Sequence, residues 1–414
     1  MEVILSISLF TIFVISILTL ESSMYSIKSW SIRELKNISE TDFGNISNTP
    51  FTRYGNDTKS YDMGDYKIFM SDYIESWGRN TCNIELDLEN TYEYIDTGID
   101  IGLGNMSTDA KIRNGFMYLT SDSSISSDND LYIVDIRDKN NYKIISKLNT
   151  GPGVNALEVA GPYIYLAQAS TVRQLQIIDI HNRELPILIS QLKLPTSTAT
   201  TTSPFAYSIF YSKGYIFLGT VKWNGAELSI IDVSNPHNPI LLSVFETGTL
   251  INDIYVRENK LYLATSDMEQ MQILDISNIN NPVLISSFSP SGFSVQEGKV
   301  IDYFEDNMIF GRTVGGFNII SNHEIFDFGT STDLSNYFSR DIKGGIYGIL
   351  RRKGNIAILT HEFDHEFQIW DEKMKNVRGE FALKNNMKKM ICDNNNLYFI
   401  TGDNKAFTNL NYKI

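Results

Sequence analysis

The chain has 414 residues, of which 42% are hydrophobic and 20% are charged, so it can bury a large core. Its formal net charge of −14 argues against nucleic acid as a partner and against attachment to anionic lipid through basic residues. The two cysteines, Cys82 and Cys392, are too few for a disulfide scaffold or a four-cysteine zinc site. They could form one bridge in an exported chain.

The first predicted element is an apolar helix near the N-terminus. Residues 3–20 read VILSISLFTIFVISILTL and carry no charge over 18 residues. At about 1.5 Å per residue this helix nearly spans a hydrocarbon layer of ~30 Å. No basic residue precedes it, as one would in a signal peptide, and the nearest basic residues follow it within 28–36. That order would leave the remainder in the cytoplasm, and a missing leader would remove the conflict.

Glu2 and the run VILSISLFTIFVIS that follows it resemble the start of a mature type IV pilin. On this resemblance Glu2 corresponds to the pilin glutamate, and residues 1–40 form a helix that is first hydrophobic and then amphipathic. The resemblance implies membrane anchoring and assembly with other pilin subunits, with Glu2 in the assembly contact. Residues 41–90 are polar and rich in turn-forming residues, and we expect a linker or a small pilin-like body there.

A repeated strand pattern occupies the rest of the chain. The run LYIVDI at 131–136 returns as LQIIDI at 175–180, LSIIDV at 228–233 and MQILDI at 271–276, and more weakly as GFNIIS at 316–321, FQIWDE at 367–372 and FTNLNY at 407–412. A second apolar run precedes each copy, a third follows several copies, and a weaker run stands first in the unit. These runs are short, rich in Ile, Val, Leu and Tyr, and separated by Gly, Asn, Asp and Pro, which indicates strands and turns.

Four strands in every 40 to 53 residues are typical of the blades of a β-propeller. The 324 residues of 91–414 divide into seven units of about 46 residues. We therefore predict an all-β fold, a seven-bladed β-propeller of four-stranded blades over 91–414, preceded by the N-terminal helix. The last unit supplies only three strands, and TYEYIDTG at 91–98 resembles a fourth strand. Donating this segment to the last blade would close the ring and remove two open sheet edges.

The lines LSIIDVSNPHNPILLSVFETG at 228–248 and MQILDISNINNPVLISSF at 271–288 resemble the LVIVD-repeat family. The resemblance covers about 100–414, implies a propeller on exported or surface proteins, and implies no catalytic residue. The repeated aspartate is predicted to accept backbone N–H bonds in the turn that follows it. These structural turn residues are Asp135, Asp179, Asp232, Asp275 and Asp371.

The segment HEFDH at 361–365 matches the H-E-x-x-H signature of zinc metalloproteases. That chemistry needs a helix, because only helical spacing directs both imidazoles to one metal. Here the segment stands between two predicted strands, so we expect a hairpin loop in the sixth blade. The chain also shows no G-x-S-x-G, P-loop or G-x-G-x-x-G motif. We therefore predict no catalytic residue, no metal site and no cofactor.

Candidate binding residues lie where the innermost strands begin, at one mouth of the predicted propeller. They are Thr108, Asn155, Ser208, Asn252 and Asp253. Each could form hydrogen bonds to a ligand. The alternative for each is a structural role with backbone partners inside the propeller.

These features favour a non-catalytic binding or adhesion protein, membrane-anchored or associated with a pilus, whose propeller contacts an extracellular protein or glycan. One alternative is a surface hydrolase or lyase that uses a carboxylate at the mouth of the propeller. Carboxylates gathered there with Arg or His would favour this enzyme. Another alternative is a membrane-tethered scaffold that never enters a filament.

Overall fold

The computed structural model describes three strands between residues 52 and 69, one strand at 92–95, and most of residues 98–412. Inside the last range the description leaves out 124–127, 152, 196–203, 291–295, 305–306, 315–322, 330–333, 353, 363, 384–386 and 394–395. The predicted helix at 1–40, including Glu2, lies outside the described residues. Within the part of the chain that is described, no helix is long and apolar enough to cross a membrane.

The three strands between residues 52 and 69 belong to a unit separate from the propeller. It is a three-stranded antiparallel sheet of β1 (Thr52–Tyr54), β2 (Thr58–Asp62) and β3 (Lys67–Phe69). These strands lie within 41–90, where the sequence predicts a linker or a small body.

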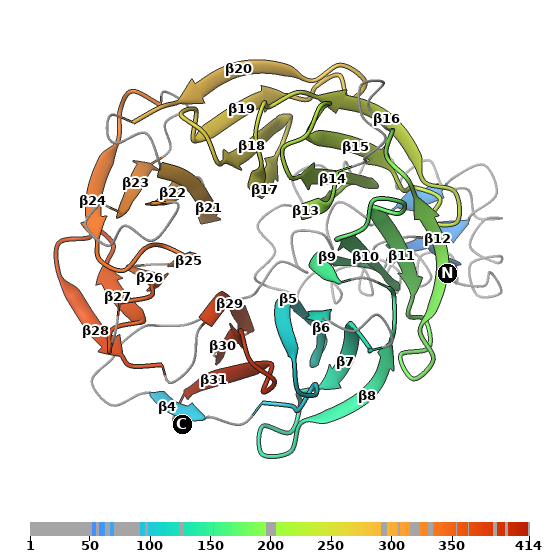
Figure 1. Ribbon diagram of the computed structural model, residues 1–414, viewed down its shortest axis with the longest axis horizontal. Helices are drawn as coiled ribbons and strands as arrows, with labels where there is room; N and C mark the ends of the chain where they lie inside the picture. The colour runs from blue at the N-terminus through green and yellow to red at the C-terminus, as the bar shows by residue number, and fades with distance from the viewer. Residues whose placement is uncertain are drawn as a thin grey trace, which may run out of the picture. The chain divides into compact units, whose positions relative to one another are not determined.

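Seven four-stranded antiparallel sheets stand around a common axis, as Figure 1 shows. In blades 1 to 6 the strands follow in chain order from the axis to the perimeter. Blade 1 has β5 (Asn105–Arg113), β6 (Phe116–Ser123), β7 (Leu131–Asp135) and β8 (Lys143–Leu148); blade 2 has β9 (Val154–Ala160), β10 (Tyr163–Gln168), β11 (Leu175–Asp179) and β12 (Ile187–Leu192); blade 3 has β13 (Ala206–Ser212), β14 (Tyr215–Thr220), β15 (Leu228–Asp232) and β16 (Ile240–Phe245).

The second half of the ring repeats this order. Blade 4 has β17 (Ile251–Arg257), β18 (Lys260–Thr265), β19 (Met271–Asp275) and β20 (Val283–Phe288); blade 5 has β21 (Gln296–Phe304), β22 (Asn307–Val314), β23 (His323–Gly329) and β24 (Phe338–Ile342); blade 6 has β25 (Gly348–Arg352), β26 (Asn355–Leu359), β27 (Phe367–Asp371) and β28 (Val377–Phe381). Blade 7 has β29 (Met387–Asp393), β30 (Asn396–Thr401), β31 (Phe407–Tyr412) and, as its outer strand, β4 (Tyr92–Ile95).

The ring is closed by a strand from the start of the propeller. β4 pairs antiparallel with β31, with Ile95 opposite Asn409 and Tyr92 opposite Tyr412. The innermost strand of each blade contacts that of the next, and β29 contacts β5. The predicted all-β architecture of seven four-stranded blades is therefore confirmed, and the closing strand lies where the sequence places it.

The repeated L-x-I-x-D strand is buried on both faces, which explains its nearly continuous apolar character. In β7, Leu131 and Ile133 pack toward blade 2, while Tyr132 and Val134 pack toward blade 7. Seven apolar clusters result, one between each pair of neighbouring blades. Each copy of the repeat thus packs against both neighbouring blades, and this is why apolar residues occupy nearly all of its positions.

The aspartate that ends the repeat forms a turn. In the five copies with a predicted turn aspartate, Oδ1 accepts the backbone N–H two residues further on; the aspartates are Asp135, Asp179, Asp232, Asp275 and Asp371. The N–H of Ser277 lowers the pKa of Asp275, the N–H of Lys375 lowers that of Asp371, and the Arg137 side chain lowers the pKa of Asp135 to about 2. These residues act inside the blade.

The third strand of blade 5 lies later in the chain than the sequence predicts. The repeat predicts this strand at GFNIIS, residues 316–321, but the strand is β23 (His323–Gly329). Its Asp327 accepts the N–H of Gly329 at 2.8 Å, which is the turn bond of the other blades. The pattern is weaker here because Glu324, at the second position of the repeat, is charged and pairs with the buried Arg312.

Cys392 lies in the innermost strand of blade 7 and is fully buried. It is disulfide-bonded. The only other cysteine of the chain is Cys82, the predicted partner, which lies outside the described residues.

Candidate functional site

Four of the five predicted rim residues bind the next blade with their side chains. The donor groups of Thr108, Asn155, Ser208 and Asn252 reach the backbone oxygens of Val154, Ala206, Ile251 and Gly298 at 2.5, 2.6, 2.8 and 2.8 Å. In each case the acceptor belongs to the innermost strand of the following blade. These hydrogen bonds link blades 1 to 5 in sequence, so the donors that could have faced a ligand hold the ring together.

The fifth candidate, Asp253, has a structural counterpart that sequence reasoning missed. Oδ1 of Asp253 accepts the N–H of Ile254 and Oδ2 accepts the N–H of Ile301 in blade 5, both at 2.9 Å. In blade 1, Asp109 bonds the N–H of Ala110 at 2.7 Å and that of Leu157 in blade 2 at 3.1 Å. Both carboxylates follow a β-bulge in an innermost strand. The two positions share a sequence signal, since each aspartate follows a polar residue and precedes an apolar one in an innermost strand.

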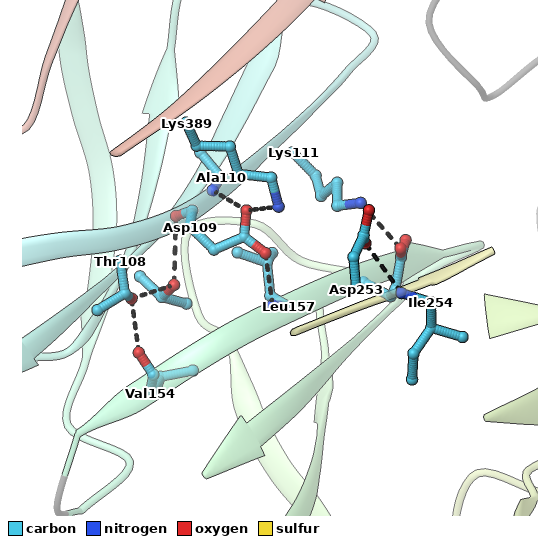
Figure 2. Close-up of polar contacts among 11 residues, drawn as sticks. Thr108, Asp109, Ala110, Lys111, Val154, Leu157, Asp253, Ile254 and Lys389 are labelled. Carbon is cyan, nitrogen blue, oxygen red and sulfur yellow. Dashed lines mark hydrogen bonds and ion pairs between the residues drawn. The ribbon is translucent and has the colours of Figure 1, made fainter. Parts of the chain in front are cut away.

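Lysines from two blades accompany these carboxylates. Lys389 of β29 forms an ion pair with Asp109, and Lys111 of β5 pairs with Glu158 of β9 at 2.8 Å. Figure 2 shows Lys389 and the N–H of Leu157 converging on the carboxylate of Asp109. Blades 7, 1 and 2 are therefore tied together near the axis by side-chain contacts that span up to 280 residues of sequence.

Asp253 differs from Asp109 because no ion pair to it is present among the described residues. Burial raises the pKa of Asp253 to about 6, while the N–H of Ile301 and the charges of Lys389 and Lys111 act in the opposite direction. Its side chain is only partly buried by accessible surface.

Asp253 should therefore destabilise the folded protein at neutral pH. A carboxyl whose pKa is higher in the folded state than in the unfolded chain binds its proton more tightly when folded. The destabilisation is absent below about pH 4 and complete above about pH 6. Asp253→Asn should remove a penalty of about 1–2 kcal/mol at pH 7.5, less than the full ~3 kcal/mol of a two-unit shift because water still reaches the group. The amide has one acceptor for the two N–H groups of Ile254 and Ile301, which costs about 1 kcal/mol at every pH, so the net gain at pH 7.5 is below about 1 kcal/mol.

Thermal unfolding of the wild type and Asp253→Asn between pH 4 and 8 measures this effect. The gain in melting temperature should disappear toward pH 4. Asp267→Asn, an exposed residue between β18 and β19, is the control and should change little at any pH. An equal gain at pH 4 and pH 7.5 would show that the charge of Asp253 is not its cause.

The HEFDH segment lies between β26 and β27, in a loop without helix. The His361 ring stacks on Tyr347, with centroids 3.6 Å apart, and its Nε2 lies 2.8 Å from the oxygen of Met387. His365 instead pairs through Nδ1 with Glu380 at 2.9 Å. The two imidazoles have separate partners, so this segment lacks the shared face that the zinc signature requires. Among the described residues no group of three or more His, Cys, Asp or Glu side chains could hold a metal ion.

A second repeated position escaped sequence reasoning. The side chain of the residue just before the third strand of a blade accepts a backbone N–H beyond the outer strand. The pairs are Asp130 with Thr150, Gln174 with Leu194, Glu227 with Thr247 and Glu366 with Leu383. Burial raises the pKa of Asp130 to about 6. The signal was the polar residue that precedes each L-x-I-x-D run.

The perimeter is where apolar side chains face solvent. Ile187, Ile240 and Val283 occupy equivalent positions, each opposite the repeated aspartate of its blade, and are 54%, 51% and 50% exposed. They belong to β12, β16 and β20, three successive outer strands that run from the right side to the top of Figure 1. A serine of β12 and one of β16 also donate to the next blade: Ser190 to the oxygen of Pro236 at 2.6 Å and Ser243 to the oxygen of Ile279 at 2.7 Å. Isoleucines and valines repeated in this way on solvent-facing strands are typical of a contact surface.

Comparison with known protein families identifies two of the repeats. Residues 206–247 and 251–289, which correspond to blades 3 and 4, match the LVIVD repeat. The chain therefore carries LVIVD repeats within a seven-bladed propeller, a combination that fits a binding or scaffold role. No curated protein matches the chain.

Several solved structures share the fold at low sequence identity. The chain is similar to the computationally designed Ika8 protein (9% identity, 77% of this chain, 99% of that chain, TM-score 0.53). It is also similar to the WD40 β-propeller domain of Doa1 (12%, 78%, 97%, 0.53) and to hydrazine synthase of Kuenenia stuttgartiensis (10%, 76%, 97%, 0.56). At these identities the similarity shows the propeller fold alone.

Proposed function

We propose that this protein is a non-catalytic binding protein displayed on the cell surface, and that its propeller contacts a partner through the perimeter. The observation that carries the proposal is the exposed aliphatic triad of Ile187, Ile240 and Val283 on successive blades. The polar side chains at the axis support this proposal indirectly. Their donors and charges already form hydrogen bonds and ion pairs between blades, which leaves the perimeter as the surface for a partner. An apolar side chain that is half-exposed still gains free energy when contact with another molecule removes its remaining surface from water.

The N-terminal segment supplies the display in this proposal. An apolar helix over residues 3–20 anchors the chain in a membrane or in a pilus. In a filament the carboxylate of Glu2 would neutralise the N-terminal amine of a neighbouring subunit away from water, where an unpaired charge is costly. The extracellular partner is a protein or a glycan.

A carboxylate enzyme is the second candidate. Asp253, whose pKa is raised to about 6, could exchange a proton near neutral pH. Lys111 and Lys389 influence it, whereas the enzyme hypothesis expects Arg or His beside the carboxylates. Because both oxygens of Asp253 accept backbone N–H groups, the structural role is favoured.

Capture of surface proteins and glycans by the full chain tests the binding proposal. The triple variant Ile187→Ser, Ile240→Ser, Val283→Ser should reduce capture at least tenfold while leaving the fold intact, since these side chains are only half-buried. The control is Leu103→Ser with Met268→Ser, which removes exposed apolar side chains outside the outer strands. Asp253→Asn should capture normally. Loss with Asp253→Asn, or none with the triple variant, would contradict the proposal.

Display on the surface is tested in cells that express the full chain. The wild type should be recovered in filaments sheared from the surface, and Glu2→Ala should be absent from them while still inserting in the membrane. If Glu2→Ala is recovered at wild-type levels, the pilin-like role fails and the tethered scaffold replaces it.

A further inference from the structure

Two arginines lie on one aromatic ring where blades 1 and 2 meet. The guanidinium carbons of Arg137 and Arg183 are 4.9 and 4.8 Å from the centre of the Phe116 ring. Arg137 follows β7 in blade 1, Arg183 follows β11 in blade 2, and Phe116 begins β6. Since β5 begins at the mouth and ends just before Phe116, this group lies on the opposite face of the propeller. The ring attracts each cation, but the two positive charges repel each other.

Arg137 already has a partner for its charge. Its Nε donates to Oδ1 of Asp135 at 2.9 Å, and one of its terminal nitrogens pairs with Oδ2. The stem of the side chain lies on Gly115, where an added Cβ would overlap Cγ of Arg137. The Arg137 side chain is 65% exposed, so its other terminal nitrogen can still reach a ligand from solvent.

Arg183 is held in place, but its charge has no partner. Its Nε donates to the hydroxyl of the buried Tyr118 at 2.9 Å. The two terminal nitrogens of Arg183 have no protein partner in the described part of the chain, and neither nitrogen is buried. A guanidinium that is fixed in this way presents two parallel N–H groups, the arrangement that matches two oxygens of a phosphate or a carboxylate.

The contact between blades does not require an arginine at this position. The backbone oxygen of Arg183 accepts the hydroxyl of Ser146 in blade 1 at 2.6 Å. At the next two junctions the same bond is accepted by the backbone oxygens of Pro236 and Ile279. All three acceptors stand four residues after the repeated aspartate of their blade. Proline and isoleucine thus make this contact with backbone alone, so the guanidinium of Arg183 calls for another explanation.

A third cation stands beside the two arginines. Lys143 of β8 is exposed and lies opposite Asp135 in the ladder. The bond from Arg137 is the main cause that lowers the pKa of Asp135, and the charge of Lys143 acts in the same direction. Glu184, next to Arg183 in the chain, is exposed and forms no ion pair with it among the described residues. Three cations therefore share one carboxylate, which leaves two positive charges in excess.

We infer that Arg183, Arg137 and Lys143 bind a small phosphate monoester, such as a sugar phosphate, at the junction of blades 1 and 2. A phosphate monoester carries a charge of about −1.5 to −2 at pH 7 and three oxygens that accept strong hydrogen bonds, so it matches the excess of two positive charges. A carboxylate or a sulfate ester carries one charge and would leave a cation unmatched. A long polyanion does not fit, because the net charge of −14 on the chain repels it.

Thermal unfolding of the full chain at pH 7.5 tests this site with inorganic phosphate and glucose 6-phosphate as probes. Either probe at about 10 mM should raise the melting temperature by roughly 2–4 °C, as a dissociation constant on the order of 1 mM implies. Glucose should not, nor should NaCl at equal ionic strength. Arg183→Ile introduces the residue that blade 4 has at this position and should abolish the gain. Arg378→Ile, which removes an exposed arginine from β28, is the matched control and should keep it.

The same measurements separate binding from a structural role. If Arg183→Ile melts lower than the wild type but gains as much from phosphate, Arg183 only links the two blades and the inference is wrong. If glucose 6-phosphate gives no gain, or NaCl gives an equal one, no phosphate ester is bound and the inference is equally wrong. Lys143→Gln should weaken the affinity about threefold, because it removes one exposed cation. The triple serine variant of the perimeter should respond as the wild type does, so failure of this site and failure of the perimeter contact are distinguishable.

Discussion

A chain that starts at Gly98 should be far less stable than one that starts at Thr91. The shorter chain lacks β4, the outer strand of blade 7, which pairs with β31 over four residues. Its loss removes about four hydrogen bonds at ~1 kcal/mol each, so we expect a destabilisation of more than about 3 kcal/mol. It also leaves β31 as an open edge, which favours aggregation.

Denaturant unfolding of residues 91–414 and 98–414, expressed side by side, measures this difference. Fragment 91–414 contains all seven described blades and should fold cooperatively. A proline at Tyr94, opposite Leu410, tests the same strand in the full chain because it removes a backbone donor and restricts the strand. If 98–414 unfolds at the same denaturant concentration as 91–414, the closing strand contributes little.

The blade architecture could be predicted from the sequence because the repeat serves two interfaces. Residues such as Leu131 and Tyr132 face opposite neighbours, so nearly every position of the strand is apolar and the run is easy to recognise. The third strand of blade 5 could not be predicted, because its sequence departs from the repeat. Glu324, which pairs with Arg312, is charged where the other copies have an uncharged residue, and the apolar run at 316–321 resembles the repeat more closely.

The rim was only half predictable. Sequence placed Asn155 and Asn252 correctly at the start of innermost strands, but a strand start can direct an amide toward a ligand or toward the next blade. The structure shows the second, with Asn155 bonding the oxygen of Ala206. Sequence alone could not decide this, because the acceptor lies 51 residues away and is backbone, which carries no residue-type signal.

The axis contacts were invisible for a related reason. Asp109 and Lys389 are 280 residues apart and meet only because the first and last blades are neighbours in a closed ring. Ring closure was predicted, but closure does not say which side chains of β5 and β29 meet. An aspartate inside an innermost strand is the type of signal that identifies such a contact, since a buried carboxylate requires partners.

Asp109→Ala should cost about 2–3 kcal/mol of unfolding free energy, the second large effect expected in this protein, because a buried N–H loses its acceptor while water partly replaces the lost partner of the exposed Lys389. Asp109 is 2% exposed and accepts the N–H of Leu157 in addition to the ion pair with Lys389. Removing it leaves a buried N–H without its partner and a lysine without its carboxylate. Three blades lose their common contact at once.

The double variant Asp109→Ala, Lys389→Met tells how much of this cost is the unpaired charge. Removing the ammonium should recover more than ~1 kcal/mol relative to the sum of the single variants, because neighbouring partners are not additive. Asp253→Asn provides the comparison at the equivalent position of blade 4, where no ion pair is broken and stability rises at neutral pH. Guanidinium unfolding at pH 7.5 gives all four free energies. If the two single variants add without coupling, or if Asp109→Ala costs less than about 1 kcal/mol, then Lys389 and Asp109 do not join blades 7 and 1, and the hydrophobic cluster between those blades holds the ring closed without them.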